Sequence, residues 1–266
     1  MTDFELFLFS VDPHFIRAAV DAGVNGVVVD WESADKSRRQ NGYDTEINRH
    51  TVADLECVRH TTDCTILCRI NNDPDRLACE TEAAIAGGAD ELLLPMVRSV
   101  EEVERLLDRV RDRCRVGMLI ETPEAVAICT DFRRLPLARV YVGLNDLSIG
   151  MRYRHLFEAL QDGTLDAVRR QVSAPFGWGG LTRPDRGRPV PCHLLIAEMA
   201  RLGCQFSFLR RSFHADVPEA DLQQAVRDIR DRLRTAAARE PAQIERERQE
   251  LYTVLAALDR GPEVHS

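Results

Sequence analysis

Two carboxylates in the middle of the sequence, Glu121 and Asp146, each follow a short apolar run. Residues 116–120 precede Glu121, and residues 140–144 come just before Asp146. Between the runs, residues 122–129 place a proline at a helix start and apolar residues at helical spacing, which predicts strand, helix, strand. Neighbouring parallel strands end at one edge of a sheet, where α/β proteins bind ligands. The two acids are therefore candidate functional groups.

Three further charged residues end apolar runs in the same way. Asp30 and Glu32 close the run 26–32 and share one face by the period of two, and Arg69 closes the run 65–71. Two carboxylates on adjacent strands, with open positions beside them, suit Mg²⁺ or Mn²⁺. A 2-oxo acid bound to such an ion would bring its keto oxygen to Arg69, which would stabilise an enolate. The alternative is a solvated rim or a set of structural ion pairs.

The elements that would position these residues alternate along the chain. Eight strands are expected, at residues 5–10, 26–32, 65–71, 91–96, 116–120, 140–144, 176–183 and 204–211, with helices between them. The connections include a capping box at Ser99–Glu102, a helix over 152–171 and a long polar loop over 33–48. This count predicts a single (β/α)8 TIM barrel over 1–240. A C-terminal helical extension, 241–266, follows the barrel.

Composition excludes several classes of protein. A net charge of -8 over 266 residues disfavours a nucleic-acid scaffold. No apolar run reaches the roughly 20 residues of a membrane span, and the N-terminus lacks a signal peptide's basic start, so we expect a cytoplasmic protein. Lys36 is the only lysine and lies in a charged run, which disfavours Schiff-base catalysis.

Five stretches together resemble the HpcH/HpaI aldolase and citrate lyase beta-subunit superfamily of metal-dependent barrels. They are residues 26–32 (GVVVDWE), 68–71 (CRIN), 87–96 (GGADELLLPM), 118–122 (MLIET) and 142–148 (VGLNDLS). The resemblance implies a carbon–carbon lyase of the class II aldolase type, with a divalent metal on Glu121 and Asp146 and with Arg69 on the enolate oxygen. It also implies that backbone around Gly143 and Asn145 binds the substrate carboxylate. Members of the family form homo-oligomers, so the extension 241–266 would dock on a neighbouring subunit; the alternative is a tail that packs on its own chain or frays.

The sequence departs from the family pattern at two positions. Pyruvate aldolases of the family have a histidine base directly after the second-strand acids, and the citrate lyase branch has an acid there, whereas this chain has Ser33. The aldolases also have a glutamine where this chain has Leu119. The base is therefore open, and Asp30 or Glu32 are candidates. His14, after the first strand, and His214, after the eighth, are further candidates, ahead of His193.

A glycine-rich stretch, 176–188, carries Arg183, Arg186 and Arg188. The loops after strands seven and eight often bind phosphate in TIM barrels, and Arg210 and Arg211 belong to the same sector. This pattern favours a substrate with an anionic distal group, a phosphate or a second carboxylate. The alternative is a tight turn with solvated arginines.

These observations favour a lyase that acts through the enolate of pyruvate or another 2-oxo acid. Two alternatives remain. One is citrate-lyase-like chemistry on an acyl thioester, and the other is a non-catalytic barrel that binds a metal and a 2-oxo acid but has lost its base at Ser33.

Overall fold

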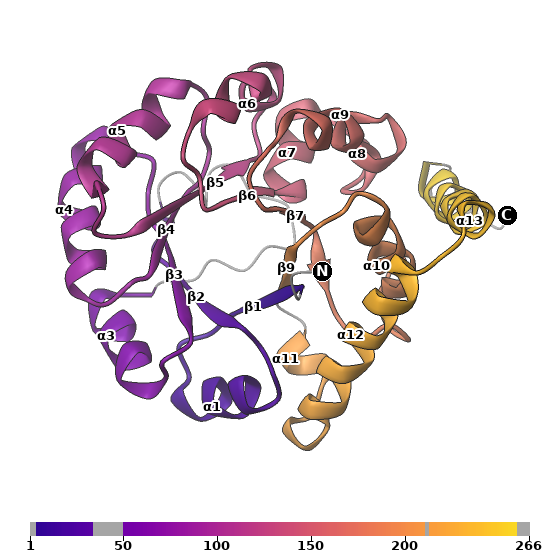
Figure 1. Cartoon of the computed structure of the whole chain (residues 1–266), viewed down its shortest axis with the longest axis horizontal. Coiled ribbons are helices and arrows are strands. Elements are labelled where there is room, and N and C mark those ends of the chain that lie inside the picture. The colour runs from indigo at the N-terminus through magenta and orange to yellow at the C-terminus, as the bar shows by residue number, and fades with distance from the viewer. Residues whose placement is uncertain (1–3, 34–49, 211–212, 260–266) are drawn as a thin grey trace, which may run out of the picture.

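The protein folds as a barrel of parallel strands surrounded by helices (Figure 1). The computed structural model describes residues 4–33, 50–210 and 213–259, so Lys36, Arg211 and most of the loop predicted over 33–48 lie outside the described residues. The strands are β1 (Glu5–Phe9), β2 (Gly26–Asp30), β3 (Thr65–Arg69), β4 (Glu91–Leu94), β5 (Arg115–Ile120), β6 (Arg139–Val142), β7 (Phe176–Trp178), β8 (Gly180–Leu181) and β9 (Phe206–Leu209).

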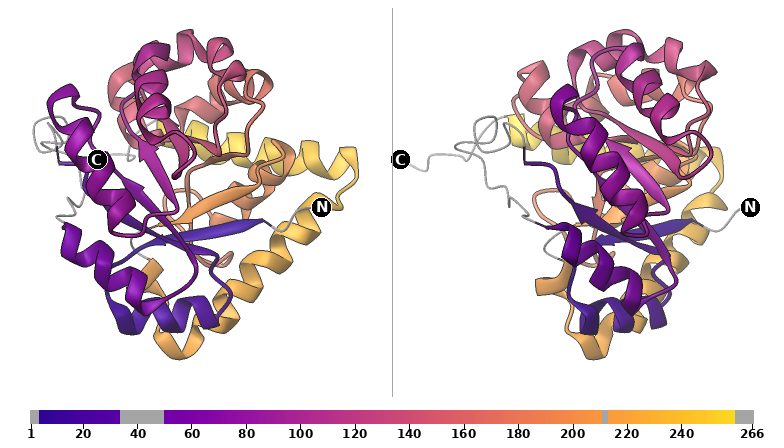
Figure 2. Two further views of the ribbon diagram at one scale, coloured as in Figure 1. Left: turned by 60° about the vertical axis from the view of Figure 1, so that its left-hand side comes forward. Right: turned by 90° about the vertical axis from the view of Figure 1, so that its left-hand side faces the viewer.

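The helices follow the strands and cover the outside of the barrel. They are α1 (Pro13–Asp21), α3 (Val52–Thr61), α4 (Pro74–Ala86), α5 (Val100–Val110), α6 (Pro123–Ala127), α7 (Leu144–Met151), α8 (Glu158–Gln161), α9 (Thr164–Gln171), α10 (Cys192–Arg201), α11 (Phe213–Asp216), α12 (Leu222–Ala237) and α13 (Pro241–Asp259), with short 3₁₀ turns η1 (Cys129–Arg134) and η2 (Glu219–Asp221). The right-hand view of Figure 2 faces α3, α4 and α5, which lie in front of the strands. None of the described helices has both the length and the apolar character needed to cross a bilayer.

The barrel closes through one interrupted segment. β7 pairs with β6, and β8 pairs with β9, while β1 joins β2 to β9. Gly179 separates β7 from β8 with a φ of 62°, a left-handed conformation that favours glycine. Its carbonyl accepts hydrogen bonds from the hydroxyls of Tyr141 and Ser207. The nine strand segments thus correspond to the eight predicted strands, and the (β/α)8 prediction is confirmed.

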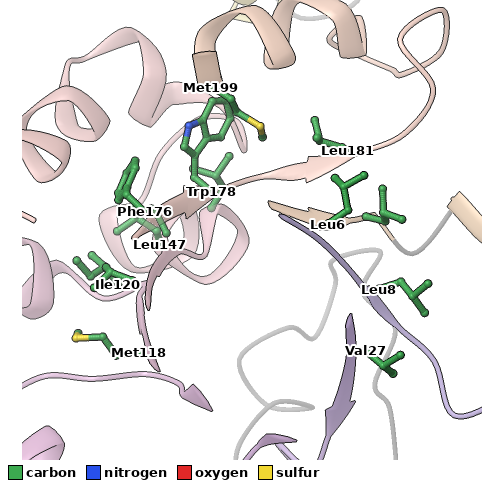
Figure 3. Close-up of a cluster of buried hydrophobic side chains, with 14 of the residues drawn as sticks. Leu6, Leu8, Val27, Met118, Ile120, Leu147, Phe176, Trp178, Leu181 and Met199 are labelled. Atoms are coloured by element: carbon green, nitrogen blue, oxygen red, sulfur yellow. The ribbon is translucent and has the colours of Figure 1, made fainter. Parts of the chain in front are cut away.

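Alternate residues of the strands point into the barrel or out towards the helices, as the strand period requires. The inner cluster consists of Phe7, Val28, Leu67, Leu93, Leu119, Tyr141, Phe206 and Phe208. Leu119 therefore lies in an apolar layer, which suits its side chain better than a glutamine. Outward-facing residues pack on the helices, and Figure 3 shows Trp178 of β7 beside Met199 of α10.

A buried ion pair fills the barrel where its strands begin. Nε of Arg139 donates to Glu91 at 2.7 Å, and Nη1 donates to Glu5 at 3.2 Å. The guanidinium also lies over the rings of Phe7 and Phe206, at 4.5 and 4.9 Å from their centroids. Replacing either Arg139 or Glu91 should destabilise the protein, because the other charge would then be buried without a partner of opposite sign.

Two predicted element boundaries and one predicted helix cap are wrong. The strand predicted over 140–144 ends at Val142, because Gly143 caps α7. The helix predicted over 152–171 is divided into α8 and α9, with the left-handed residues Arg152 and Gly163 before and between them. Ser99 makes no capping hydrogen bond with its side chain, and the carboxylate of Glu102 is instead bound by the Asn72 side chain and the Arg98 backbone.

The C-terminal helix α13 packs on the barrel of its own chain. Its buried residues Leu251 and Leu255 join the main core, and the helix contacts α10 and α8 (Figure 1). At its end, Asp259 lies 3.2 Å from both Arg154 and His155. Docking of this helix on a neighbouring subunit stays a prediction.

Candidate active site

Arg69, at the carboxyl end of β3, is held by the two acids that follow β2. Its Nε and Nη2 donate to the two carboxylate oxygens of Asp30, both at 2.8 Å, and its Nη1 lies 3.2 Å from Oε2 of Glu32. The guanidinium carbon lies 5.4 Å from the ring centroid of Phe9 at the end of β1. All three charged side chains are buried. Burial lowers the pKa of Arg69, but the charges of Asp30 and Glu32 outweigh burial and raise this pKa well above its ordinary value.

Glu121, directly after β5, lies in the same cluster. Its Oε1 accepts a 2.8 Å hydrogen bond from the backbone N–H of Met96, which adopts a left-handed φ of 51°. Burial and the negative charges of Glu32 and Asp146 raise the pKa of Glu121 to about 8, although Arg69 lowers it. The charges of Glu32 and Asp146 therefore act on Glu121, and burial makes this repulsion costly.

Asp146 reaches this cluster from a helix rather than from a strand end. It is the third residue of α7, whose N-cap is Gly143, and it is 9% exposed. The first turn of a helix leaves backbone N–H groups without partners inside the helix and favours negative charge. A Cβ on Gly143 would lie 2.3 Å from Oε2 of Glu121, so only glycine leaves room for that carboxylate. The start of α7 therefore contributes a carboxylate and the backbone amides of a helix N-terminus, and Gly143 lets Glu121 approach it closely.

The donor set fits a hard divalent cation. Glu121 and Asp146 offer carboxylate oxygens, and the repulsion that raises the pKa of Glu121 would be relieved by a positive ion. Within residues 4–33, 50–210 and 213–259, no group of three or more His, Cys, Asp or Glu side chains is arranged to hold a metal. A site of two carboxylates that leaves other positions to water and substrate agrees with both observations.

The proposed distal anion site contains arginines that already have acidic partners. Arg183 pairs with Asp185 at 3.1 Å, and Arg210 lies 3.7 Å from Asp216. The nearby Gly177 serves packing, because a Cβ there would lie 2.4 Å from the carbonyl oxygen of Phe206. These contacts are those of a structural loop, and recognition of an anion by Arg183 and Arg210 stays a prediction.

The two candidate histidines lie at the rim formed by α1 and α11. His14 is largely exposed and lies 3.1 Å from Glu219. The ring of His214 packs on Phe15, with 4.1 Å between the centroids. Asp30 and Glu32, the other candidates, directly contact Arg69. The structure thus places Asp30 and Glu32 beside Arg69, whereas His14 lies beside Glu219 and His214 beside Phe15.

Several residues of the cluster were missed from the sequence. Asn71 and Glu80 form a buried network beside Glu32, and Nδ1 of His50 accepts a 3.0 Å hydrogen bond from the backbone N–H of Asp30. Met96 contributes its backbone N–H, which binds the carboxylate of Glu121. The one available signal was that Asn71 follows Arg69 by two residues and so shares its face of the strand.

The comparisons with known proteins agree on architecture. No protein-family profile and no curated protein sequence matches the chain. The chain is similar to the crystal structure of RipC from Yersinia pestis, with a TM-score of 0.55 and 15% identity over 91% of this chain and 99% of that one. A citrate lyase from Burkholderia xenovorans gives a TM-score of 0.59 and 12% identity over 95% and 82% of the two chains.

A third similar structure is 3-hexulose-6-phosphate synthase from Salmonella typhimurium. It gives a TM-score of 0.60 and 14% identity over 87% of this chain and 99% of that one. At such identities the likeness establishes the fold. The chain has the (β/α)8 barrel fold that these three structures share with it.

Proposed function

We propose that the protein is a divalent-metal-dependent carbon–carbon lyase that acts through the enolate of pyruvate or another 2-oxo acid. The observation that carries the proposal is the buried cluster of Glu121, Asp146 and Glu32 around Arg69 at the carboxyl ends of the strands. This end of a (β/α)8 barrel is where catalytic residues lie. The motif resemblance and the likeness to a citrate lyase structure point to the same chemistry.

Glu121 and Asp146 would hold the metal, Mg²⁺ or Mn²⁺, which would polarise the carbonyl oxygen of a bound 2-oxo acid. Arg69 would stabilise the negative charge that develops on that oxygen. Asp30 takes two of the five N–H groups of the guanidinium and fixes its orientation. The remaining donors lie in a buried setting, where electrostatic stabilisation is stronger than in water.

The start of α7 would bind the substrate carboxylate. Gly143 turns the chain from β6 into the helix, and the N–H groups of Leu144 and Asn145 belong to its first turn, where backbone N–H groups have no partner within the helix. With the carboxylate at α7 and the keto oxygen at Arg69, the substrate would extend from the end of β6 towards the end of β3. Arg183 and Arg210 would then be available to an anionic distal group.

The proposal is tested by cleavage of 4-hydroxy-2-oxo acids in the presence of Mn²⁺, with pyruvate release as the signal. Wild type is expected to release pyruvate, whereas Arg69→Ala and Glu121→Gln should not. Arg113→Ala, which removes an exposed pair with Glu82, is a control that should keep activity. Cleavage of acyl thioesters alone would favour the citrate-lyase-like alternative. No cleavage of either class would contradict the proposal.

A further inference from the structure

The backbone group that binds Glu121 is in an unfavourable conformation. The N–H of Met96 donates to Oε1 of Glu121 at 2.8 Å, and Met96 has a φ of 51°. This left-handed conformation is uncommon for a residue with a side chain, whereas glycine adopts it freely. It persists only where neighbouring contacts impose it, and such positions are concentrated at functional sites. The contacts that hold Met96 therefore also determine where Oε1 of Glu121 lies.

Asn72, between β3 and α4, holds the carbonyl group of Met96. Its Nδ2 donates to that carbonyl oxygen at 3.2 Å and to Oε2 of Glu102 in α5 at 3.0 Å. The same oxygen of Glu102 accepts the backbone N–H of Arg98 at 2.7 Å. Nη1 of Arg98 also lies 3.4 Å from the carbonyl oxygen of Met96, but this side chain is half exposed. The amide of Asn72 thus ties Met96 to the first turn of α5.

Thr122 holds the same turn, residues 95–98, from the side of β5. Its Oγ1 donates to the carbonyl oxygen of Val97 and accepts the N–H of Ala125 at 3.1 Å. Because Thr122 follows Glu121, two successive residues after β5 are bonded to two successive residues of the turn. Val97 and Thr122 are both buried. The turn is therefore fixed between β3 and β5, and Oε1 of Glu121 is fixed with it.

The contact at Oε1 also sets the direction of the second oxygen of Glu121. Oε2 faces the start of α7, since a Cβ on Gly143 would lie 2.3 Å from it. Asp146, the other proposed metal-binding carboxylate, is the third residue of that helix. Metal–oxygen distances hold within about 0.2 Å, so a small rotation of the Glu121 carboxylate is enough to weaken a metal bound there.

We propose that Asn72 is a positioning residue for the metal-binding carboxylate of Glu121, and that it acts by holding Met96 in the left-handed conformation. The inference rests on the proposed function, in which Glu121 is a metal ligand. Without the amide of Asn72, Met96 relaxes towards a negative φ, and its N–H turns away from Oε1. Glu121 then loses the hydrogen bond that orients it. Groups that bind a metal ligand rather than the metal contribute about 10- to 100-fold to metal affinity.

The first test is titration of the protein with Mn²⁺ alone, followed by electron paramagnetic resonance. Asn72→Ala should weaken Mn²⁺ binding about 10-fold. Asn25→Ala is the matched control, since the Asn25 side chain accepts the N–H of Leu6 at the opposite end of the barrel, and its Mn²⁺ affinity should be that of wild type. A folded Asn72→Ala protein with wild-type Mn²⁺ affinity overturns the inference.

Met96→Gly tests the route through the backbone. Glycine keeps the N–H that binds Glu121 and adopts a positive φ without help from Asn72. In the Met96→Gly background, Asn72→Ala should therefore change Mn²⁺ affinity by no more than about twofold, the scatter expected of independent sites. A general loss of stability would not be relieved in this way. A loss as large as that in the wild-type background shows that Asn72 does not act through Met96, and it overturns the inference.

The inference and the proposed function fail in different ways. At saturating Mn²⁺, Asn72→Ala should exchange the methyl protons of pyruvate in D₂O at the wild-type rate, because only metal binding is impaired. Exchange that stays low at saturating Mn²⁺ would give Asn72 a part in the chemistry and overturn its positioning role. A wild-type protein that binds Mn²⁺ through Glu121, but neither exchanges nor cleaves any 2-oxo acid, overturns the proposed function and leaves the role of Asn72 in place.

Discussion

Replacing Gly143 by alanine should weaken metal binding while leaving the fold intact. The backbone of Gly143 has φ −82° and ψ 91°, which alanine adopts without strain. The added Cβ would, however, lie 2.3 Å from Oε2 of Glu121 and 3.1 Å from its Cβ. Carbon and oxygen atoms rarely approach closer than about 3.3 Å, so the carboxylate oxygen must move by about 1 Å.

That displacement is large for a metal ligand. Metal–oxygen distances hold within roughly 0.2 Å, and Oε1 cannot follow easily because it is bound to the N–H of Met96. We expect Mn²⁺ affinity to fall about 10- to 100-fold, which corresponds to about 1.4 to 2.7 kcal/mol. Titration of Mn²⁺ by electron paramagnetic resonance measures the affinity, and circular dichroism checks the fold.

Gly150→Ala is the matched control for this substitution. It places a methyl group in the same helix, α7, but against a ring carbon of Pro123 rather than against a carboxylate. Its Mn²⁺ affinity should stay within twofold of wild type. A folded Gly143→Ala protein with wild-type Mn²⁺ affinity would refute the assignment of Glu121 as a metal ligand.

Three further predictions concern stability. Because folding raises the pKa of Glu121 from 4.5 to about 8, the metal-free protein should be most stable below pH 4.5 as far as this group is concerned, and should lose up to about 5 kcal/mol as the pH rises to 8. Urea unfolding across this range measures the loss, Glu121→Gln should abolish it, and an opposite slope attributable to Glu121 would contradict the burial argument. Arg139→Ala should cost about 3 to 5 kcal/mol, since it leaves Glu91 buried and uncompensated, without changing Mn²⁺ affinity; a stability within 1 kcal/mol of wild type would show that Glu91 is neutral in the folded protein. Leu255→Ala should cost about 2 to 5 kcal/mol in urea if α13 packs on its own barrel, and an effect that appears only at high protein concentration would instead indicate docking between subunits.

Much of the barrel could be predicted because its strands are buried on both faces. The strands β2 and β5 are continuous apolar runs, and such runs stand out from the amphipathic helices around them. Each apolar run ends at the edge of the sheet, where polar side chains can contact solvent or a ligand. The ends of these runs therefore predict that Asp30, Arg69 and Glu121 lie close together. The order of strands then followed from the short connections.

The parts that could not be predicted depend on contacts between distant segments. Asp146 was assigned to a strand end because the apolar run continues to Leu144, and only the glycine cap shows that α7 has begun. Glu102 fits the capping-box spacing, yet Asn72, thirty residues away, binds its side chain. The link from Asn71 to Ser33 spans thirty-eight residues, and no local pattern reports it.

We propose that Arg69, Glu121 and Asp146 form one enolate-stabilising site. Its most direct test is exchange of the methyl protons of pyruvate in D₂O with Mn²⁺, followed by proton NMR. We predict exchange by wild type, and none above background by Arg69→Ala, Glu121→Gln or Asp146→Asn. Exchange that continues in any of these three folded variants would contradict it.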